Sequence, residues 1–138
     1  LEAYATGTRP SGIMESVAAA LPDDTIRELA AYYGRLSAFG SESPGSSQAA
    51  GASIARDGIP ELRVPSCSDC HGPGITPRRD VYPRLAGQDA AYLVQQLELF
   101  ESGARGGSEF AHLMDPVASR LPASAMREVA NYYASLED

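Results

Sequence analysis

The sequence predicts an all-α protein. Apolar residues recur at helical spacing in several segments, and no segment alternates convincingly between apolar and polar residues as a half-buried β-strand would. One stretch also occurs twice: residues 14–36 (MESVAAALPDDTIRELAAYYGRL) align without a gap with residues 114–136 (MDPVASRLPASAMREVANYYASL). An internal repeat of this length indicates two copies of one structural unit.

Four helices are expected, in chain order over 23–37, 47–57, 89–102 and 122–136. Pro22 and the two acidic residues after it mark the start of the first helix, because negative charge is favourable at a helix N-terminus. Gly58 and Gly103 are expected to end the second and third. The apolar residues that share a face in the first and last helices are Ile26, Leu29, Ala30, Tyr33 and Leu36, and Met126, Val129, Ala130, Tyr133 and Leu136.

The repeat predicts a tandem of two homologous domains. Residues 1–39 are interpreted as the C-terminal part of a first domain, and residues 48–138 as a complete second one. The stretch LEAYATGTR (1–9) also resembles LELFESGAR (97–105), which extends the repeat upstream. Between the two units, residues 40–47 (GSESPGSS) have the polar, Gly/Pro/Ser-rich composition of a linker. The glycine- and proline-rich stretch 72–87 is expected to be a loop.

Composition restricts the class of protein. A net charge of -7 and a pI near 4.7 argue against nucleic-acid binding. They suit partners with basic surfaces, and equally an acidity that only keeps the protein in solution. No apolar run approaches the roughly 18 residues of a membrane span. No signal peptide is visible, and the sequence begins with Leu1 rather than Met, which predicts a processed chain or a fragment.

The only two cysteines lie in the run Cys67-Ser68-Asp69-Cys70-His71, which matches the pattern for attachment of c-type haem. Residues three and four apart share a face of a helical turn, so Cys67, Cys70 and His71 can all reach one flat macrocycle. Two alternatives are a thioredoxin-like dithiol and half of a zinc site. The dithiol calls for a βαβ pattern that is not evident, and zinc needs two further ligands.

A second axial ligand to the iron would be a thioether or an imidazole. The candidates are Met114, Met126 and His112. Met126 falls on the apolar face of a helix, where core packing is expected. Met114 is expected in irregular chain and has a repeat twin in Met14, whereas the counterpart of His112 is a glycine. Recurrence in both copies favours Met114.

Residues 67–136 resemble the class I c-type cytochromes, and most closely the two-haem cytochrome c4 group. The matching segments are CSDCHG (67–72), YPRLAGQ (82–88), YLVQQL (92–97) and the methionine-to-YY stretch up to residue 136. The resemblance implies a class I cytochrome c fold, thioether anchors at Cys67 and Cys70, His71 as proximal ligand and Met114 as distal ligand.

Further roles also follow from the resemblance alone. The carbonyl of Pro83 would accept a hydrogen bond from His71, and Tyr92 would line the haem pocket together with one of Tyr132 and Tyr133. Gly51 and Ile54 would let the helix over 47–57 cross the last helix. Met14 would be the distal ligand of a first haem, although the sequence contains no second Cys-x-x-Cys-His run.

The expected function is outer-sphere electron transfer by one covalent haem c, without catalysis. A second haem would depend on a segment that supplies another attachment motif. Expected partners are an oxidase, a reductase or a dehydrogenase subunit, and attachment of this kind implies a bacterial periplasmic location after removal of a signal peptide. Two other readings are a cytochrome subunit bound to a dehydrogenase, and a haem enzyme or ligand sensor with a vacant distal position.

Overall fold

A computed structural model describes residues 1–36, 48–72 and 81–136 of the chain. Over these residues the regular structure is helical, apart from an isolated antiparallel bridge between Ile59 and Val64, so the all-α prediction is confirmed. The predicted linker 40–47 and most of the predicted loop 72–87 lie outside the described residues. The elements in chain order are α1 (Glu2–Ala5), α2 (Met14–Ala19), α3 (Asp23–Tyr33), α4 (Gln48–Asp57), η1 (Pro60–Leu62), α5 (Ser68–His71), α6 (Ala90–Glu101), η2 (Ala111–Leu113), α7 (Asp115–Ala118) and α8 (Ala123–Ala134).

The helix ends follow local chemistry. Pro22 and Pro122 precede α3 and α8 in an extended conformation that a proline ring readily adopts. The side chain of Asp89 accepts a hydrogen bond of 2.8 Å from the backbone N–H of Tyr92 and so caps α6. Gly58 follows α4 with a φ of 70°, the left-handed conformation in which glycine commonly ends helices.

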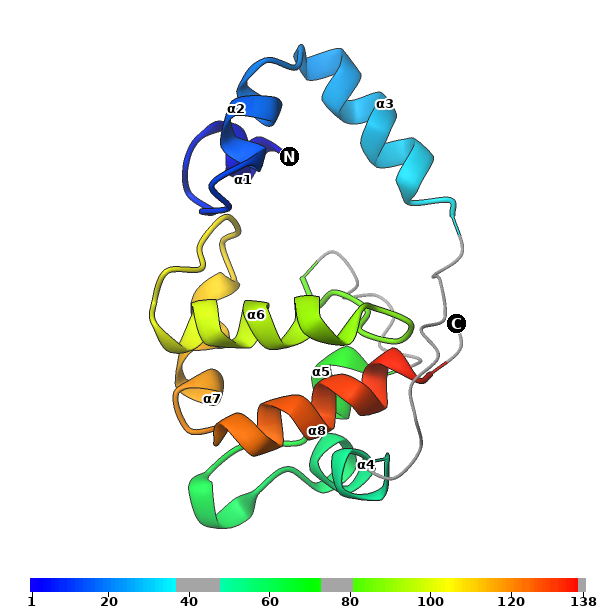
Figure 1. Ribbon diagram of the computed structural model, residues 1–138, viewed down its shortest axis with the longest axis vertical. Coiled ribbons are helices and arrows are strands. Elements are labelled where there is room, and N and C mark those ends of the chain that lie inside the picture. The colour runs from blue at the N-terminus through cyan, green and yellow to red at the C-terminus, as the bar shows by residue number, and fades with distance from the viewer. Residues whose placement is uncertain (37–47, 73–80, 137–138) are drawn as a thin grey trace.

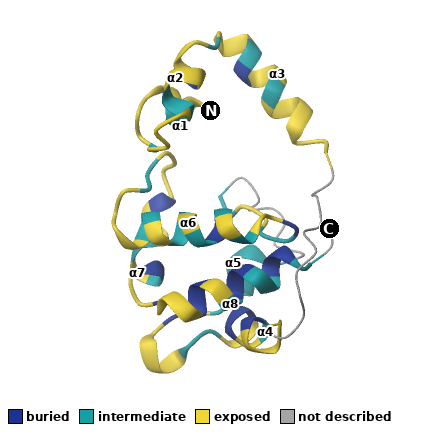
Figure 2. Ribbon diagram, viewed as in Figure 1, coloured by how far each residue is buried: buried dark blue, intermediate teal, exposed yellow. Residues whose placement is uncertain are grey.

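The core lies around α8, which packs against α4 on one side and α6 on another (Figure 1). In Figure 2 the buried residues concentrate on these helices. Burial of apolar side chains is the main force that holds them together. The buried members of this cluster are Ile54, Ala55, Val64, Leu93, Leu121, Ala125, Met126, Val129, Ala130 and Tyr133.

A glycine permits the close crossing of α4 and α8. A Cβ atom on Gly51 would lie 2.2 Å from the carbonyl oxygen of Glu128 and 2.7 Å from the Cβ of Tyr132. Both distances are far inside van der Waals contact, so no larger residue fits at this crossing without movement of a helix. Ile54, one turn further along α4, is buried in the same core. The predicted roles of Gly51 and Ile54 in this crossing are confirmed.

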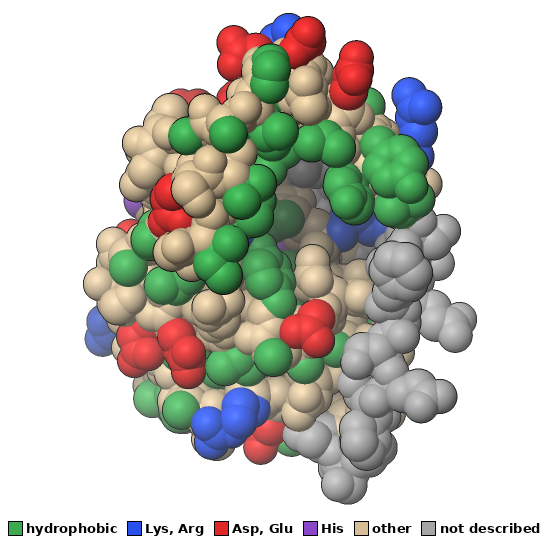
Figure 3. All heavy atoms as spheres, turned by 45° about the horizontal axis from the view of Figure 1, so that its top comes forward, with side chains coloured by type: hydrophobic (Ala, Val, Ile, Leu, Met, Phe, Trp, Pro, Cys, Tyr) green, Lys and Arg blue, Asp and Glu red, His purple; other side chains and the backbone are tan. Residues whose placement is uncertain are grey.

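The repeat copy at the N-terminus is packed differently. Helix α3 stands apart from the bundle in Figure 1, and of its predicted apolar face only Ile26 is buried. Tyr33 is 65% exposed, whereas its twin Tyr133 is 3% exposed. The exposure of the two tyrosines differs because α4 and α6 cover α8, whereas no described helix covers α3 to that extent. Figure 3 shows hydrophobic side chains gathered around a hollow on this side of the molecule.

Candidate haem-attachment site

Cys70 lies in α5 and Cys67 occupies the N-cap position of that helix, so one turn of backbone brings the two cysteines together. The N–H groups of Cys70 and His71 donate to the carbonyl of Cys67 over 3.2 and 2.8 Å. Gly72 closes the turn onto Ser68, whose carbonyl oxygen would lie 2.5 Å from a Cβ at that position. The three predicted haem-binding side chains are therefore displayed from one helical turn, as their spacing requires.

Contacts with α4 and α8 fix the position of this turn. The hydroxyl of Ser66 donates to the carbonyl of Ala55 over 3.1 Å, and the Cys67 sulfur lies 3.9 Å from the carbonyl of Ile54. On the other side, the hydroxyls of Ser68 and Tyr133 are 3.5 Å apart. The attachment turn is thus tied to the two helices that form the core.

His71 has a defined orientation. Its Nδ1 lies 2.7 Å from the carbonyl oxygen of Pro83, which can only accept, so Nδ1 carries the proton and Nε2 has a free lone pair. Burial lowers the pKa of His71, and the hydrogen bond that its ring donates to the Pro83 carbonyl partly opposes that shift. The ring of Tyr82 meets the imidazole edge-on, with centroids 6.2 Å apart. A neutral imidazole with a free Nε2 is the form that binds a metal.

The two cysteines are free thiols and half-buried. Burial raises the pKa of Cys67 to about 11, which opposes formation of the thiolate that a zinc site or a reactive dithiol needs. Within the described ranges, no three His, Cys, Asp or Glu side chains come together as a metal-binding group. The donor set fits attachment of a haem better than either alternative.

The candidates for the second axial position fall in different environments. Met114 is half-buried and forms a bend between η2 and α7, so it lies outside regular helix as expected, although a short helix flanks it on each side. Met126 is 2% exposed in the core of α8, consistent with packing. His112 is exposed, and its Nδ1 lies 2.9 Å from the carbonyl of Glu109. Met14, the repeat twin of Met114, begins α2 and is half-buried.

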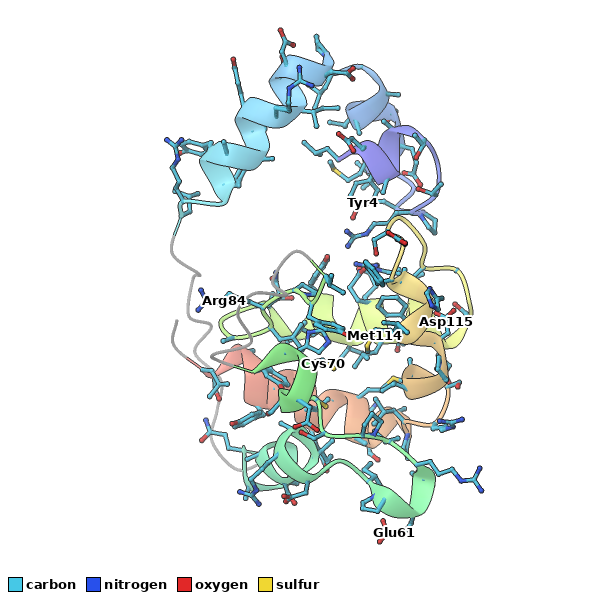
Figure 4. The ribbon with its side chains drawn as sticks, turned by 180° about the vertical axis from the view of Figure 1, so that it is seen from behind. Tyr4, Glu61, Cys70, Arg84, Met114 and Asp115 are labelled. Atoms are coloured by element: carbon cyan, nitrogen blue, oxygen red, sulfur yellow. The ribbon has the colours of Figure 1, made fainter. Side chains whose placement is uncertain are left out.

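Tyr92, which is predicted to line the haem pocket, contacts the N-terminal part of the chain. Its hydroxyl accepts a hydrogen bond from the side chain of Arg9, at the boundary with the N-terminal part of the chain. Tyr133, by contrast, reaches α5 directly. Figure 4 shows the attachment turn at Cys70, with Met114 on the same part of the molecule and Tyr4 on the N-terminal part. Sequence reasoning missed Arg9, Gln96 and Arg105, although the similarity of 1–9 to 97–105 makes the two arginines equivalent.

Comparisons with known proteins bear on this site. No family model matches the chain. The solved structure of cytochrome c4 from Acidithiobacillus ferrooxidans superposes with a TM-score of 0.83 and 30% sequence identity, covering 98% of this chain and 80% of that one. The chain belongs to the cytochrome c4 family. Membership implies covalently bound haem c and confirms the class I cytochrome fold, and it agrees with the expectation of an electron carrier rather than an enzyme.

Two other similarities are to proteins named for thiosulfate dehydrogenase. The thiosulfate dehydrogenase electron acceptor of Thiomonas intermedia (strain K12) is 33% identical over 138 residues, which are 98% of this chain and 63% of that protein. The structure of thiosulfate dehydrogenase (TsdBA) from Marichromatium purpuratum superposes with a TM-score of 0.85 and 38% identity, covering 98% of this chain and 29% of that one. This chain thus spans less than two thirds of the length of the Thiomonas protein. No helix in the described part of the chain is long and apolar enough to cross a membrane.

Proposed function

We propose that the chain is an electron-transfer cytochrome whose haem c is bonded to Cys67 and Cys70, with His71 and Met114 as the axial ligands. The observation that supports this most directly is the 2.7 Å contact between His71 Nδ1 and the Pro83 carbonyl, which leaves Nε2 available. The bound haem would exchange single electrons, at a potential that a thioether ligand raises relative to a second imidazole.

The protein's own groups prepare the site for that exchange. The Pro83 carbonyl holds the imidazole in one orientation and strengthens it as a donor. The attachment turn is held against α4 and α8, so little rearrangement would accompany a change of charge. Apolar residues of the core pack against Cys67, and an apolar shell disfavours the more highly charged oxidised state.

An intact-mass spectrum combined with a reduced-minus-oxidised optical spectrum tests this proposal. One covalent haem should add its mass to the polypeptide, with no free thiol left, because the sequence contains a single Cys-x-x-Cys-His run. Colourless protein with the mass of the bare polypeptide and two free thiols would contradict it.

The choice of distal ligand is tested by twin variants. Met114→Ala should lower the midpoint potential and open the ferrous iron to carbon monoxide, since the thioether would be lost. Met14→Ala, at the equivalent position of the other copy, should change neither in this single-haem chain. An unaltered ligand band and potential in Met114→Ala would remove that residue from the site.

We also propose the tandem organisation: residues 1–39 as the C-terminal part of one cytochrome domain, a linker over 40–47 and a complete domain over 48–138. The burial of twin residues supports it, since Ala18 and Ala118 are 1% and 0% exposed. Met14 would then be the ligand of a first haem whose attachment residues this sequence does not contain. A longer polypeptide with an added Cys-x-x-Cys-His segment should carry two haems by mass, the second sensitive to Met14→Ala.

A second candidate function is that of an electron acceptor for a dehydrogenase, with thiosulfate dehydrogenase as the first enzyme to try. The similarity to an electron acceptor of that name over 98% of this chain favours it. Stopped-flow mixing of the oxidised cytochrome with thiosulfate and a thiosulfate dehydrogenase should reduce the haem within the turnover time of the enzyme. Reduction no faster than with thiosulfate alone would exclude that enzyme as its partner. A periplasmic location is part of the proposal and can be checked by cell fractionation.

A further inference from the structure

Two arginines meet where the N-terminal segment contacts α6. One guanidinium nitrogen of Arg9, Nη2, donates to Gln96 Oε1 over 2.9 Å and also to the Tyr92 hydroxyl. The Nε of Arg105 donates to the same Gln96 oxygen over 2.5 Å. Two positively charged groups therefore share a single neutral acceptor.

The cluster is a built feature rather than a chance encounter of long side chains. Arg9 stacks over the ring of Tyr4 with 4.8 Å to the centroid, and Arg105 stacks over Phe100 at 4.7 Å. In the alignment of 1–9 with 97–105, Tyr4 is the twin of Phe100 and Arg9 is the twin of Arg105. Each copy thus contributes the same stacked pair, which limits the freedom of both guanidinium groups.

Glycines allow the two segments to approach. A Cβ on Gly106 would lie 2.4 Å from the carbonyl oxygen of Thr8, and one on Gly107 would lie 2.6 Å from the Cβ of Ala3. Figure 4 shows Tyr4 at the edge of the N-terminal part that faces the rest of the molecule. The arginines are consequently held together by the backbone on both sides.

The positive charges of Arg9 and Arg105 are not balanced by a neighbouring carboxylate among the described residues. Neither Arg9 nor Arg105 lies within 4 Å of a carboxylate of the described residues. The chain has 18 acidic residues, so carboxylates are common in this protein although none of the described ones lies beside these two arginines. Burial, and then the charge of Arg9, lower the pKa of Arg105. Like charges in a half-buried position cost free energy unless an anion lies beside them.

We propose that Arg9 and Arg105 together bind a carboxylate, and that this carboxylate is a propionate of the haem. The inference rests on the proposed haem. Each guanidinium has five N–H donors in a planar fork suited to carboxylates, and the contacts described above use only some of them. Tyr92 and Gln96 belong to α6, which packs on α8, and α8 contacts the haem-attachment turn through Tyr133. Haem c carries two propionate groups, and in this proposal one of them extends from the attachment turn to the side of α6 that holds the arginines.

The binding would have two consequences. The arginines would place positive charge beside the haem, and positive charge there favours the ferrous state over the more positively charged ferric state. Residues 1–9 would also become part of the haem environment of the other copy. The site is complete only when both segments are in place, since each supplies one arginine.

Midpoint potentials of the holoprotein test the proposal. Arg9→Gln and Arg105→Gln should each lower the potential, because a positive charge beside the haem is lost. Arg127→Gln removes the same charge from an exposed position on α8 and serves as the matched control, with a smaller shift. Arg9→Lys keeps the charge but not the fork, so it should recover most of the potential, which a purely structural role would not allow.

Redox-difference infrared spectra give an independent readout. The haem carboxylate bands should shift in Arg9→Gln and Arg105→Gln and stay in place in Arg127→Gln. If both variants match Arg127→Gln in potential and in these bands while mass and optical spectra show the haem attached, the arginine assignment fails and the haem proposal stands. If the wild-type potential instead follows added citrate at constant ionic strength and that response disappears in Arg9→Gln, the carboxylate comes from solution and the assignment to haem is overturned.

Discussion

At the scale of single residues, Tyr133 links the core to the haem-attachment turn. Its ring is buried in the core, and its hydroxyl lies 3.5 Å from that of Ser68, the residue after Cys67. Burial raises the pKa of Tyr133 to about 12, because the phenolate would lose its hydration. The folded protein therefore prefers the neutral phenol more strongly than the unfolded chain does.

This preference predicts a loss of stability in alkali. Between pH 10, the ordinary pKa of a tyrosine, and about pH 12, the unfolded state releases the proton while the folded state keeps it, so the free energy of unfolding falls as the pH rises. Tyr133→Phe should remove a loss on the order of 2 kcal/mol while keeping the ring. Denaturant unfolding of both proteins at pH 9 and pH 11.5 measures it. An equal decline in the two would rule out Tyr133 as the source.

Residues that act through a contiguous motif were predictable from the sequence, and residues that act across the fold were not. Cys67, Cys70 and His71 lie within one turn, so their spacing reports their geometry directly. The role of the Pro83 carbonyl as acceptor follows only from the family resemblance, since nothing in the local sequence pairs Pro83 with His71. Arg9 and Gln96 lie 87 positions apart, and no periodicity or motif connects two such polar residues.

At the scale of helices, the crossing of α4 and α8 depends on Gly51. Gly51→Ala would place a methyl group 2.2 Å from the carbonyl oxygen of Glu128, so the helices must separate. We expect a loss of about 2–3 kcal/mol in the free energy of unfolding. Ser53→Ala on the exposed face of α4 is the control, with a change under about 0.5 kcal/mol. Equal midpoints of chemical unfolding for the two variants would contradict this.

Helical periodicity predicted the long helices to within a few residues but could not predict what covers them. The apolar pattern of residues 23–37 identifies a face, and the same pattern over 122–136 is buried only because α4 and α6 lie against it. The helices η2 and α7 beside Met114 have three and four residues, which is too few for a helical repeat of apolar residues to be seen in the sequence. The sequence therefore predicts irregular chain there.

The unequal cover of α3 and α8 predicts unequal protection of their backbone. Local opening costs less where few apolar side chains are buried, and α3 buries Ile26 alone, whereas α8 buries six of its residues. Amides of α3 should exchange on the order of a hundredfold faster than those of α8 in this chain. Hydrogen-exchange mass spectrometry of peptides from 23–33 and 123–134 measures the difference. Similar protection of the two helices would mean that the face of α3 is covered in solution.

At the scale of the whole molecule, the net charge of -7 bears on the encounter with a redox partner. Opposite charges accelerate association over distances that salt screens, whereas apolar docking is insensitive to salt. If the dehydrogenase presents a basic surface, the second-order rate of haem reduction should fall about tenfold between 10 mM and 0.5 M salt.

Reduction by a neutral hydroquinone provides the control for that experiment, because its rate carries no charge–charge contribution and should stay flat over the same range. Arg127→Gln, which makes the chain more negative, should steepen the dependence on salt with a basic partner. A rate that rises with salt would indicate an acidic partner surface instead, and the charge of this cytochrome would then oppose rather than assist the transfer of electrons to it.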